Sequence, residues 1–588
     1  MAWGTQPSIK IVDAFGNTVT SSTATVSLAL SGGASGAILA CTGGNAKAAV
    51  AGVAVFAGCK VDLAGSGYQL TATATGLGGV TTNTFTITVG AAAQLVFVTQ
   101  PGGGTGGTAW ATQPSLNVLD AGGNLVTSSS LSVTLSITTG SGTSGAVLAC
   151  TPGLSASAAS GIVTFAGCRI DKAGAGYTLK ATGAGVSAAT SSTLAITVGA
   201  PAKLAFGTQP GGGTAGAAWA TQPAVLVQDA GGNTVPTATN AVAIALGAGP
   251  AGATLTCTGG LTLAATAGTA GFAGCTIDKA GTGYTLVASA TGLTSITSAT
   301  LSVVAAGGVA LAVTTQPGGG IGGTAWGTQP SIRVIDAWGN TAASTASITL
   351  AISAGTGTSG ATLACTGGNA KAASAGVATF SGCKIDLAGT GYTLTATSPG
   401  LASVVTNSLN VTVGTPALAT FTVQPGGGTG GLAWAVQPVI QLLDAGGNPT
   451  TTATTSVTLA ITTGTGTAGA LLTCAGGLSK AAVAGVVTFS GCAIDKAGAN
   501  YTLKLTGTGL ATATSAALTV TVGPGAKLLV GTQPGGGTAG APWTTQPVIV
   551  VADAGGNTVT DATDTVTLAL AAIRRGRSRA RAGRALTR

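Results

Sequence analysis

Short runs of alternating apolar and polar residues, separated by Gly-rich stretches, make up almost the whole chain. Alternation with a period of two, carried by β-branched residues, is typical of strands with one buried face. Between residues 200 and 306 we predict seven strands: Lys203–Gly207, Ala224–Gln228, Ala241–Leu246, Ala253–Cys257, a short run around Phe272, Tyr284–Ala290 and Ala299–Val304. Seven short strands in about 107 residues indicate a β-sandwich.

The same pattern returns with a period of about 108 residues, a length that suits a self-contained domain rather than a solenoid unit. Each copy contains Trp-x-x-Gln-Pro and continues into Asp-Ala-x-Gly-Asn, whose residue types favour a tight turn. The six Trp positions are Trp3, Trp110, Trp219, Trp326, Trp434 and Trp543. We therefore expect a tandem array of separate domains, arranged as beads on a string.

Most copies end in Val-Gly, which we take as the boundary between repeats. The predicted domains are repeat 1 at 1–90, which lacks its first strand, repeat 2 at 91–199, repeat 3 at 200–306, repeat 4 at 307–414, repeat 5 at 415–523, a truncated repeat 6 at 524–572, and an Arg-rich tail at 573–588. The tail begins where the sixth copy should continue into its next strand, and no signal peptide precedes the first copy. We interpret the tail as an aberrant end and the chain as a fragment of a longer secreted protein. The alternative is a tail that binds nucleic acid or an anionic surface.

The ten cysteines form five pairs, and the two members of each pair lie 18 residues apart. The pairs are Cys41 and Cys59, Cys150 and Cys168, Cys257 and Cys275, Cys365 and Cys383, and Cys474 and Cys492. One pair per repeat, without any Cys-x-x-Cys, predicts one disulfide in each repeat and an oxidising compartment. A structural zinc site would need four ligands, which one Cys pair without His does not supply.

Two stretches of repeat 4 carry a family resemblance. The turn in Val334–Asn340 resembles that of bacterial immunoglobulin-like repeats of the invasin and intimin type, and Cys383–Leu394 resembles the tyrosine-corner approach to strand F of immunoglobulin-like domains. The resemblance implies an all-β array of immunoglobulin-like sandwiches. In antibody domains the second Cys lies two residues after the Tyr, whereas here it lies nine residues before it. The disulfide is therefore expected within a D–E segment and not between the two sheets.

The composition restricts the chemistry that is available. The chain has no His, all its 13 acidic residues are Asp, and 45% of its residues are hydrophobic. The last value, with charged residues at only 6%, argues against disorder. Without His and Glu the chain lacks the usual general base, the His-dependent triads and the commonest zinc ligand. The longest apolar run, Leu301–Val313, is broken by Gly307 and Gly308 and is too short to span a membrane. We expect no enzyme activity, no cofactor and no catalytic, cofactor-binding or metal-binding residue.

Two groups of residues nevertheless suggest binding sites. Asp occupies two repeated positions, as at Asp229 and Asp278, and could contribute to a calcium site or a glycosidase pair; we favour turn capping. Phe15 and Trp338 stand at the x of the Asp-Ala-x-Gly-Asn turn, where the other copies have Gly. An exposed aromatic could stack on a sugar ring or on another domain. We expect these two side chains to pack against a neighbouring segment.

The sequence favours a non-enzymatic stalk, structural or adhesive, located outside the cell or on its surface. The ligand of such a stalk would be a glycan or a protein, and the sequence does not identify which. The alternative is a non-catalytic spacer or carbohydrate-contacting region of a larger secreted hydrolase. Outside the tail 15 basic and 13 acidic residues nearly balance, so nucleic acid is not an expected partner. The chain is expected to be monomeric.

Overall fold

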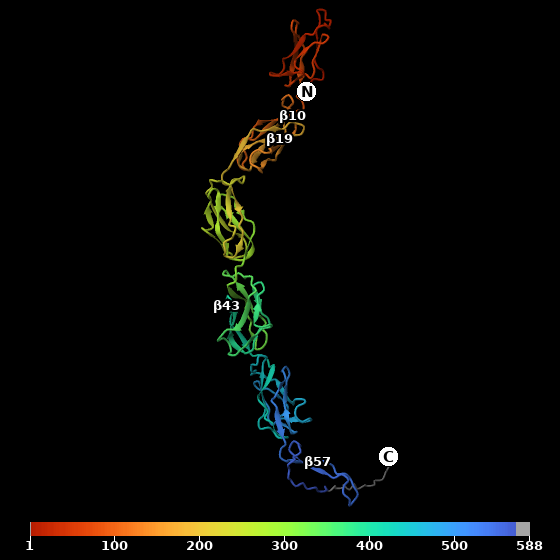
Figure 1. Cartoon of the computed structure of the whole chain (residues 1–588), viewed down its shortest axis with the longest axis vertical. Helices are drawn as coiled ribbons and strands as arrows, with labels where there is room; N and C mark the ends of the chain where they lie inside the picture. The colour runs from red at the N-terminus through yellow and green to blue at the C-terminus, as the bar shows by residue number, and fades with distance from the viewer. Residues whose placement is uncertain (1, 572–588) are drawn as a thin grey trace, which may run out of the picture. The chain divides into compact units, whose positions relative to one another are not determined.

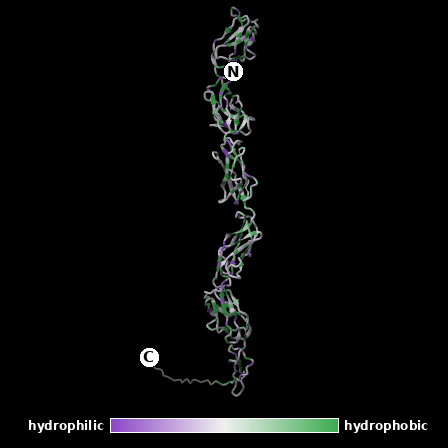
Figure 2. Cartoon of the chain, turned by 90° about the vertical axis from the view of Figure 1, so that its left-hand side faces the viewer, coloured by the Kyte–Doolittle hydropathy of each residue, from purple (hydrophilic) through white to green (hydrophobic). Residues whose placement is uncertain are grey.

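The computed structural model describes residues 2–571, and all regular elements in this range are β-strands (Figure 1). The chain divides into two compact units, Met1–Val304 and Ala305–Arg588. With the repeat bounds predicted above, the first unit holds repeats 1–3 and the second holds repeats 4 and 5 and the beginning of repeat 6. Strongly hydrophilic residues are sparse in both (Figure 2). The predicted Arg-rich tail at 573–588 lies outside the described residues.

Repeat 3 shows how the predicted strands form. Its eleven strands are β22 (Lys203–Thr208), β23 (Gly213–Thr214), β24 (Ala224–Gln228), β25 (Ala241–Ala248), β26 (Leu255–Thr258), β27 (Thr262–Ala264), β28 (Thr269–Gly271), β29 (Ala273–Ile277), β30 (Gly281–Ser289), β31 (Ile296–Thr297) and β32 (Leu301–Val304). Each predicted run corresponds to an observed strand, and β28 and β29 flank Phe272. The prediction missed β23, β27 and β31, since two or three residues are too few for an alternating pattern to stand out.

The strands of repeat 3 form the two layers of an immunoglobulin-like β-sandwich. One sheet has the order β22-β24-β28, and the other has the order β23-β32-β30-β25-β27, with β31 also paired to β30. All of these pairings are antiparallel except that of β23 with β32, which is parallel. Val225 and Val227 are buried in one layer, and Ile244 and Leu286 in the other. Their alternation with less buried neighbours places one face of each sheet in the core.

The other complete repeats contain equivalent strands, and in repeat 4 a parallel pairing of Ala310 with Ala402 joins two of the sheets into one of seven strands. Repeat 2 contains β10 (Ala92–Thr99), β11 (Gly104–Thr105), β12 (Ser115–Asp120), β13 (Ser132–Ile137), β14 (Leu148–Thr151), β15 (Ser155–Ser157), β16 (Ile162–Thr164), β17 (Ala166–Ile170), β18 (Gly174–Tyr177), β19 (Leu179–Gly183), β20 (Ala189–Thr190) and β21 (Leu194–Thr197). Repeat 4 contains β33 (Ala310–Thr315), β34 (Gly320–Ile321), β35 (Ser331–Ile335), β36 (Ser347–Ile352), β37 (Leu363–Ala364), β38 (Ala370–Ala372), β39 (Val377–Thr379), β40 (Lys384–Ile385), β41 (Gly389–Tyr392), β42 (Leu394–Ser398), β43 (Leu401–Val405) and β44 (Leu409–Thr412). Repeat 5 contains β45 (Leu418–Val423), β46 (Gly428–Thr429), β47 (Val439–Leu443), β48 (Ser456–Ile461), β49 (Leu472–Thr473), β50 (Ser479–Ala481), β51 (Val486–Thr488), β52 (Ala493–Ile494), β53 (Gly498–Tyr501), β54 (Leu503–Thr506), β55 (Ala513–Thr514) and β56 (Leu518–Thr521).

Repeats 1 and 6 contain fewer strands. Repeat 1 has β1 (Ser8–Lys10), β2 (Thr25–Ser31), β3 (Leu39–Ala40), β4 (Ala46–Ala48), β5 (Val53–Val55), β6 (Lys60–Val61), β7 (Gly65–Ala74), β8 (Val80–Thr81) and β9 (Phe85–Ile87). The described part of repeat 6 has β57 (Lys527–Thr532) paired with β58 (Val548–Ala552). Each of repeats 1–5 has a hydrophobic core made of its own residues. Among residues 2–571 there is no helix that is long and apolar enough to cross a membrane.

Candidate functional site

The predicted disulfide is present in each of repeats 1–5. The structure joins the cysteines in the five predicted pairs. In repeat 3 the bond links Cys257 of β26 to Cys275 of β29, and these two strands pair with each other. The second cysteine is fully buried. The bond therefore fastens two adjacent strands at the side of the sandwich, and it does not connect the two main sheets.

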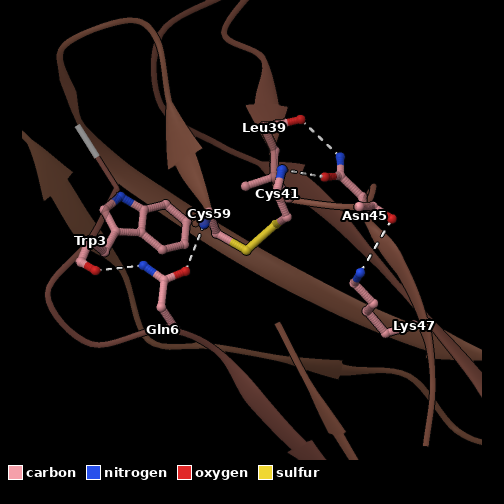
Figure 3. The surroundings of a disulfide bond; sticks show 8 residues. Trp3, Gln6, Leu39, Cys41, Asn45, Lys47 and Cys59 are labelled. Atoms are coloured by element: carbon pink, nitrogen blue, oxygen red, sulfur yellow. Dashed lines mark hydrogen bonds between the residues drawn. A yellow bond between two sulfur atoms is a disulfide. The ribbon is translucent and has the colours of Figure 1, made fainter. Parts of the chain in front are cut away.

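The Gln of Trp-x-x-Gln-Pro fastens the second cysteine to the Trp of the same motif, a role that the sequence analysis missed. In repeat 1 the Gln6 amide donates to the carbonyl oxygen of Trp3, and the backbone N–H of Cys59 donates to Gln6 Oε1 at 2.6 Å (Figure 3). The equivalent bonds of Gln437, to Trp434 and from Cys492, are 2.7 and 2.8 Å long. One amide thus satisfies two backbone groups. The signal for it was the constant Trp-x-x-Gln spacing, whereas the second Cys follows the Gln by 53 to 55 residues.

The five tyrosines hold equivalent positions, nine residues after the second Cys of their repeat. All of them are fully buried. The hydroxyl of Tyr284 donates to the carbonyl oxygen of Lys279 at 2.9 Å, and the other four make the same bond to the residue five positions upstream. A buried ring whose hydroxyl bonds upstream backbone is the arrangement of a tyrosine corner. The predicted bond from the hydroxyl to nearby backbone is confirmed.

The first repeated Asp caps the turn in which it lies. In repeat 5, Asp444 Oδ1 accepts the backbone N–H groups of Gly446 at 2.8 Å and Asn448 at 2.9 Å. Burial by itself raises the pKa of Asp444. Hydrogen bonds from Gly414, Asn448 and Gly446 outweigh this effect, so the pKa lies below its usual value. The carboxylate is ionised and saturated by N–H donors.

The second repeated Asp caps a loop on the other side of the sandwich. Asp386 Oδ1 accepts the backbone N–H groups of Thr362 and Leu387, both at 2.7 Å, and Oδ2 accepts the Thr362 hydroxyl at 2.6 Å. Burial raises the pKa of Asp386, but the hydrogen bonds from Thr362 and Leu387 hold it below its usual value. The described residues contain no group of three or more His, Cys, Asp or Glu that could hold a metal ion. Turn capping, which the sequence favoured, accounts for the contacts of both Asp positions.

The two Asp positions meet where one repeat follows another, and we call this contact a joint. At the joint between repeats 4 and 5, Asn448 Nδ2 donates to the carbonyl oxygen of Asp386 at 2.8 Å, and the N–H of Ala388 donates to Asn448 Oδ1 at 2.7 Å. Asp444 Oδ2 accepts the N–H of Gly414, which ends repeat 4, at 2.9 Å. The same three bonds form between repeats 1 and 2, 2 and 3, and 5 and 6, through Asn124, Asn233 and Asn557. The repeats of a unit are therefore bonded to each other as well as linked by the chain.

Glycines allow the two backbones of a joint to approach closely. Between repeats 4 and 5, a Cβ on Gly446 would overlap the carbonyl oxygen of Asp386. A Cβ on Gly322 would overlap the Asn448 amide, and one on Gly323 would overlap the backbone of Ala445. Gly322 and Gly323 follow β34, so the Gly-rich stretch of one repeat forms the surface on which the turn of the next repeat rests.

The aromatic residues of the turns are exposed. Phe15 is 91% exposed and Trp338 is 45% exposed. The expectation that they pack against a neighbouring segment is wrong for Phe15, and it holds only in part for Trp338. The backbone N–H of each residue donates to the Asp of its own turn, at 2.9 Å in both cases. We attribute the exposure to this bond, since it ties the backbone into the turn and leaves the side chain on the outside.

A cleft of about 490 Å³ lies at the joint between repeats 1 and 2, lined among others by Trp3, Asp62, Ile87 and Asp120. Ile87 belongs to β9, the last strand of repeat 1. In repeat 2 the equivalent edge, β21, pairs with the Gly-rich strand β11, and the Gly pair after β11 touches the next turn. The cleft thus corresponds to the place that a Gly-rich strand fills in repeats 2–5.

The sequence matches no known family and no curated protein. Similar solved structures include the Escherichia coli adhesin FdeC, with 20% identity over 55% of this chain and 99% of that one and a TM-score of 0.26. Invasin, a bacterial integrin-binding protein, has 13% identity over 74% of this chain and 82% of that one, with a TM-score of 0.22. The N-terminal eight Ig domains of Down Syndrome Cell Adhesion Molecule have 13% identity over 87% of this chain and 57% of that one, with a TM-score of 0.18.

Proposed function

We propose that the chain is a non-enzymatic stalk, with a structural or adhesive role outside the cell or on its surface. The observation that carries this proposal is repetition. The same core, disulfide and tyrosine corner return in each of repeats 1–5, and the same joint returns between neighbours within each unit. Five disulfides in one chain support an oxidising location. A stalk needs identical modules with fixed contacts, whereas a catalytic site would need a set of residues particular to one repeat.

The exposed aromatics support a second candidate, a carbohydrate-contacting region of a larger secreted hydrolase. Phe15 and Trp338 break the repetition, and both present a ring to solvent. An exposed ring can stack on the apolar face of a sugar. Only these two turns carry an aromatic at this position, so sugar binding would be confined to repeats 1 and 4.

The two candidates are separated by measuring binding to immobilised glycans with the full chain and with Phe15→Ala and Trp338→Ala. For a stalk we expect no glycan binding that depends on either ring. Binding that is lost on removing either ring would favour the carbohydrate-contacting region. As a matched control, Leu77→Ala removes an apolar side chain that is also 45% exposed but not aromatic.

A further inference from the structure

The Asp-Asn turns of repeats 1 and 5 share one geometry and differ in their burial. Asn17 donates its backbone N–H to Asp13 Oδ1 at 2.9 Å, as Asn448 does to Asp444. In this chain Asp13 and Asn17 are exposed, whereas Asp444 is fully buried and Asn448 is 7% exposed. The turn therefore has its shape without any neighbour, and contact with a preceding repeat is what buries it. A preformed surface of this kind loses little conformational entropy when it docks.

We infer that the Asp-Asn turns of repeats 2, 3, 5 and 6 are docking elements: each clasps the preceding repeat through its Asn amide and fixes the two repeats without a cation. The inference holds for either proposed function, since it concerns how neighbouring repeats are joined. It applies to the four joints within the two units, those made by Asn124, Asn233, Asn448 and Asn557.

The Asn amide occupies the centre of the joint. Asn448 Nδ2 lies 2.9 and 3.0 Å from the two oxygens of Asp444, and 2.8 Å from the carbonyl oxygen of Asp386. A cation that bridged the repeats through these three oxygens would have to lie where this N–H₂ group lies. The amide supplies the donors itself, while its oxygen accepts the N–H of Ala388. All the hydrogen-bonding groups of the amide are thus used. Its N–H₂ group bonds Asp444 within the turn and Asp386 in the preceding repeat, and its oxygen bonds the preceding repeat at Ala388.

The clasp has a shape requirement as well as a polar one. A Cβ atom on Gly323 of repeat 4 or Gly446 of repeat 5 would overlap the opposite backbone, and one on Gly322 would overlap the Asn448 amide itself. Gly555 of repeat 6 extends the pattern, because its N–H donates to the carbonyl oxygen of Gly430 at 3.0 Å. A side chain larger than hydrogen at these glycines would therefore separate the two surfaces and lengthen the hydrogen bonds beside them.

The same turn also binds the end of the preceding repeat, where the chain passes from one repeat to the next. The N–H of Gly414 donates to Asp444 Oδ2 at 2.9 Å, and the equivalent Gly523 donates to Asp553. A connecting segment that is hydrogen-bonded to the domain that follows it has less freedom to move. Clasp and linker bond together define the orientation of repeat 5 on repeat 4.

The test is hydrogen exchange, read by mass spectrometry on peptides of the full chain. In Asn448→Ala the N–H of Ala388 loses its acceptor, so we expect the peptide around Ala388 to exchange about tenfold faster, as for the loss of one hydrogen bond. Peptides from β47 and β42 should keep their protection, because the cores of repeats 5 and 4 are untouched. Asn448→Asp keeps the size of the side chain, removes the donor and places a carboxylate against Asp444. In Asn448→Asp the peptide around Ala388 should therefore exchange at least as fast as in Asn448→Ala.

Two controls sharpen the result. Asn17→Ala removes the same side chain from a turn that has no docked neighbour in this chain, and exchange should rise only within residues 13–17. Asn557→Ala should reproduce the effect at Ala497, the equivalent donor in repeat 5. Unchanged exchange at Ala388 in both Asn448 variants would overturn the clasp. Equal loss of protection throughout β47 would also overturn it, because the Asn would then support its own fold alone.

The absence of a cation requirement is tested on the same peptides in EDTA. The exchange of Ala388 and Gly414 should not change when the chelator is added. A rise in exchange that added Ca²⁺ reverses would show that a cation holds the joint, and it would overturn this part of the inference.

Discussion

Replacing Tyr284 by Phe tests whether the repeated tyrosine is structural. The substitution keeps the buried ring and removes one hydrogen bond, from the hydroxyl to the carbonyl oxygen of Lys279 at 2.9 Å. We expect a polypeptide of residues 200–306 to lose about 0.5–1.5 kcal/mol of its free energy of unfolding, the usual net contribution of one such bond. Tyr284→Ala also removes the ring and leaves a cavity, so its expected cost is about 3–5 kcal/mol.

The ring is in close contact with its surroundings, which is why the two variants should differ. A Cβ on Gly249 would overlap the ring of Tyr284, and one on Gly281 would lie 3.5 Å from it. Urea unfolding followed by circular dichroism measures both free energies, provided that the dependence on urea is the same in the variants. Equal losses for Phe and Ala would contradict the reasoning, because the ring would then contribute nothing.

A second readout uses the pKa of this residue. Burial, and after it the negative charge of Asp278, raises the pKa of Tyr284 above its ordinary value. The folded state therefore holds the phenol proton more tightly than the unfolded chain does. Stability from this source is complete below about pH 10, the ordinary value, and is lost as the pH rises through the folded pKa. The alkaline loss of stability should be smaller in Tyr284→Phe. If the variant instead abolished a binding activity and left stability intact, Tyr284 would be a site residue.

Three further predictions concern the array. Residues 200–306 alone should unfold in one cooperative transition with β-type circular dichroism, whereas a broad transition would mean that neighbouring repeats share a core. Exchanging both Cys257 and Cys275 for Ser should cost this polypeptide about 3 kcal/mol in the chain-entropy account of a loop of this size, and ten free thiols in peptides mapped without reduction would contradict all five bonds. Asp120, Asp336, Asp444 and Asp553 have pKa values below the ordinary one, because their hydrogen bonds outweigh the raising effect of burial. Their contribution is complete above about pH 4 and is lost as the pH falls through the folded values. The melting temperature of the full chain should therefore drop below pH 4, and a constant value down to pH 2 would refute this reasoning.

Most of the fold within one repeat follows from the order of its residues. The alternation around Val225 and Val227 placed β24 correctly, since one face of a strand must be apolar to be buried. The one Cys pair of the repeat, Cys257 and Cys275, predicted the disulfide, and the resemblance to immunoglobulin-like domains implied a tyrosine corner at Tyr284. Short strands such as β23 were missed because Gly213 and Thr214 carry no pattern of burial, and their strand character comes from pairing with β32.

The joints are what the tertiary structure alone decided. The sequence shows that Asp444 and Asn448 suit a turn, because local spacing determines how a side chain bonds backbone a few residues away. It does not show that Asn448 reaches Asp386, 62 residues upstream and in another domain. That contact depends on how two finished sandwiches present their ends, as does the exposure of Phe15 outside its turn. Local patterns determine each domain, whereas the surface on which one domain rests exists only after both have folded.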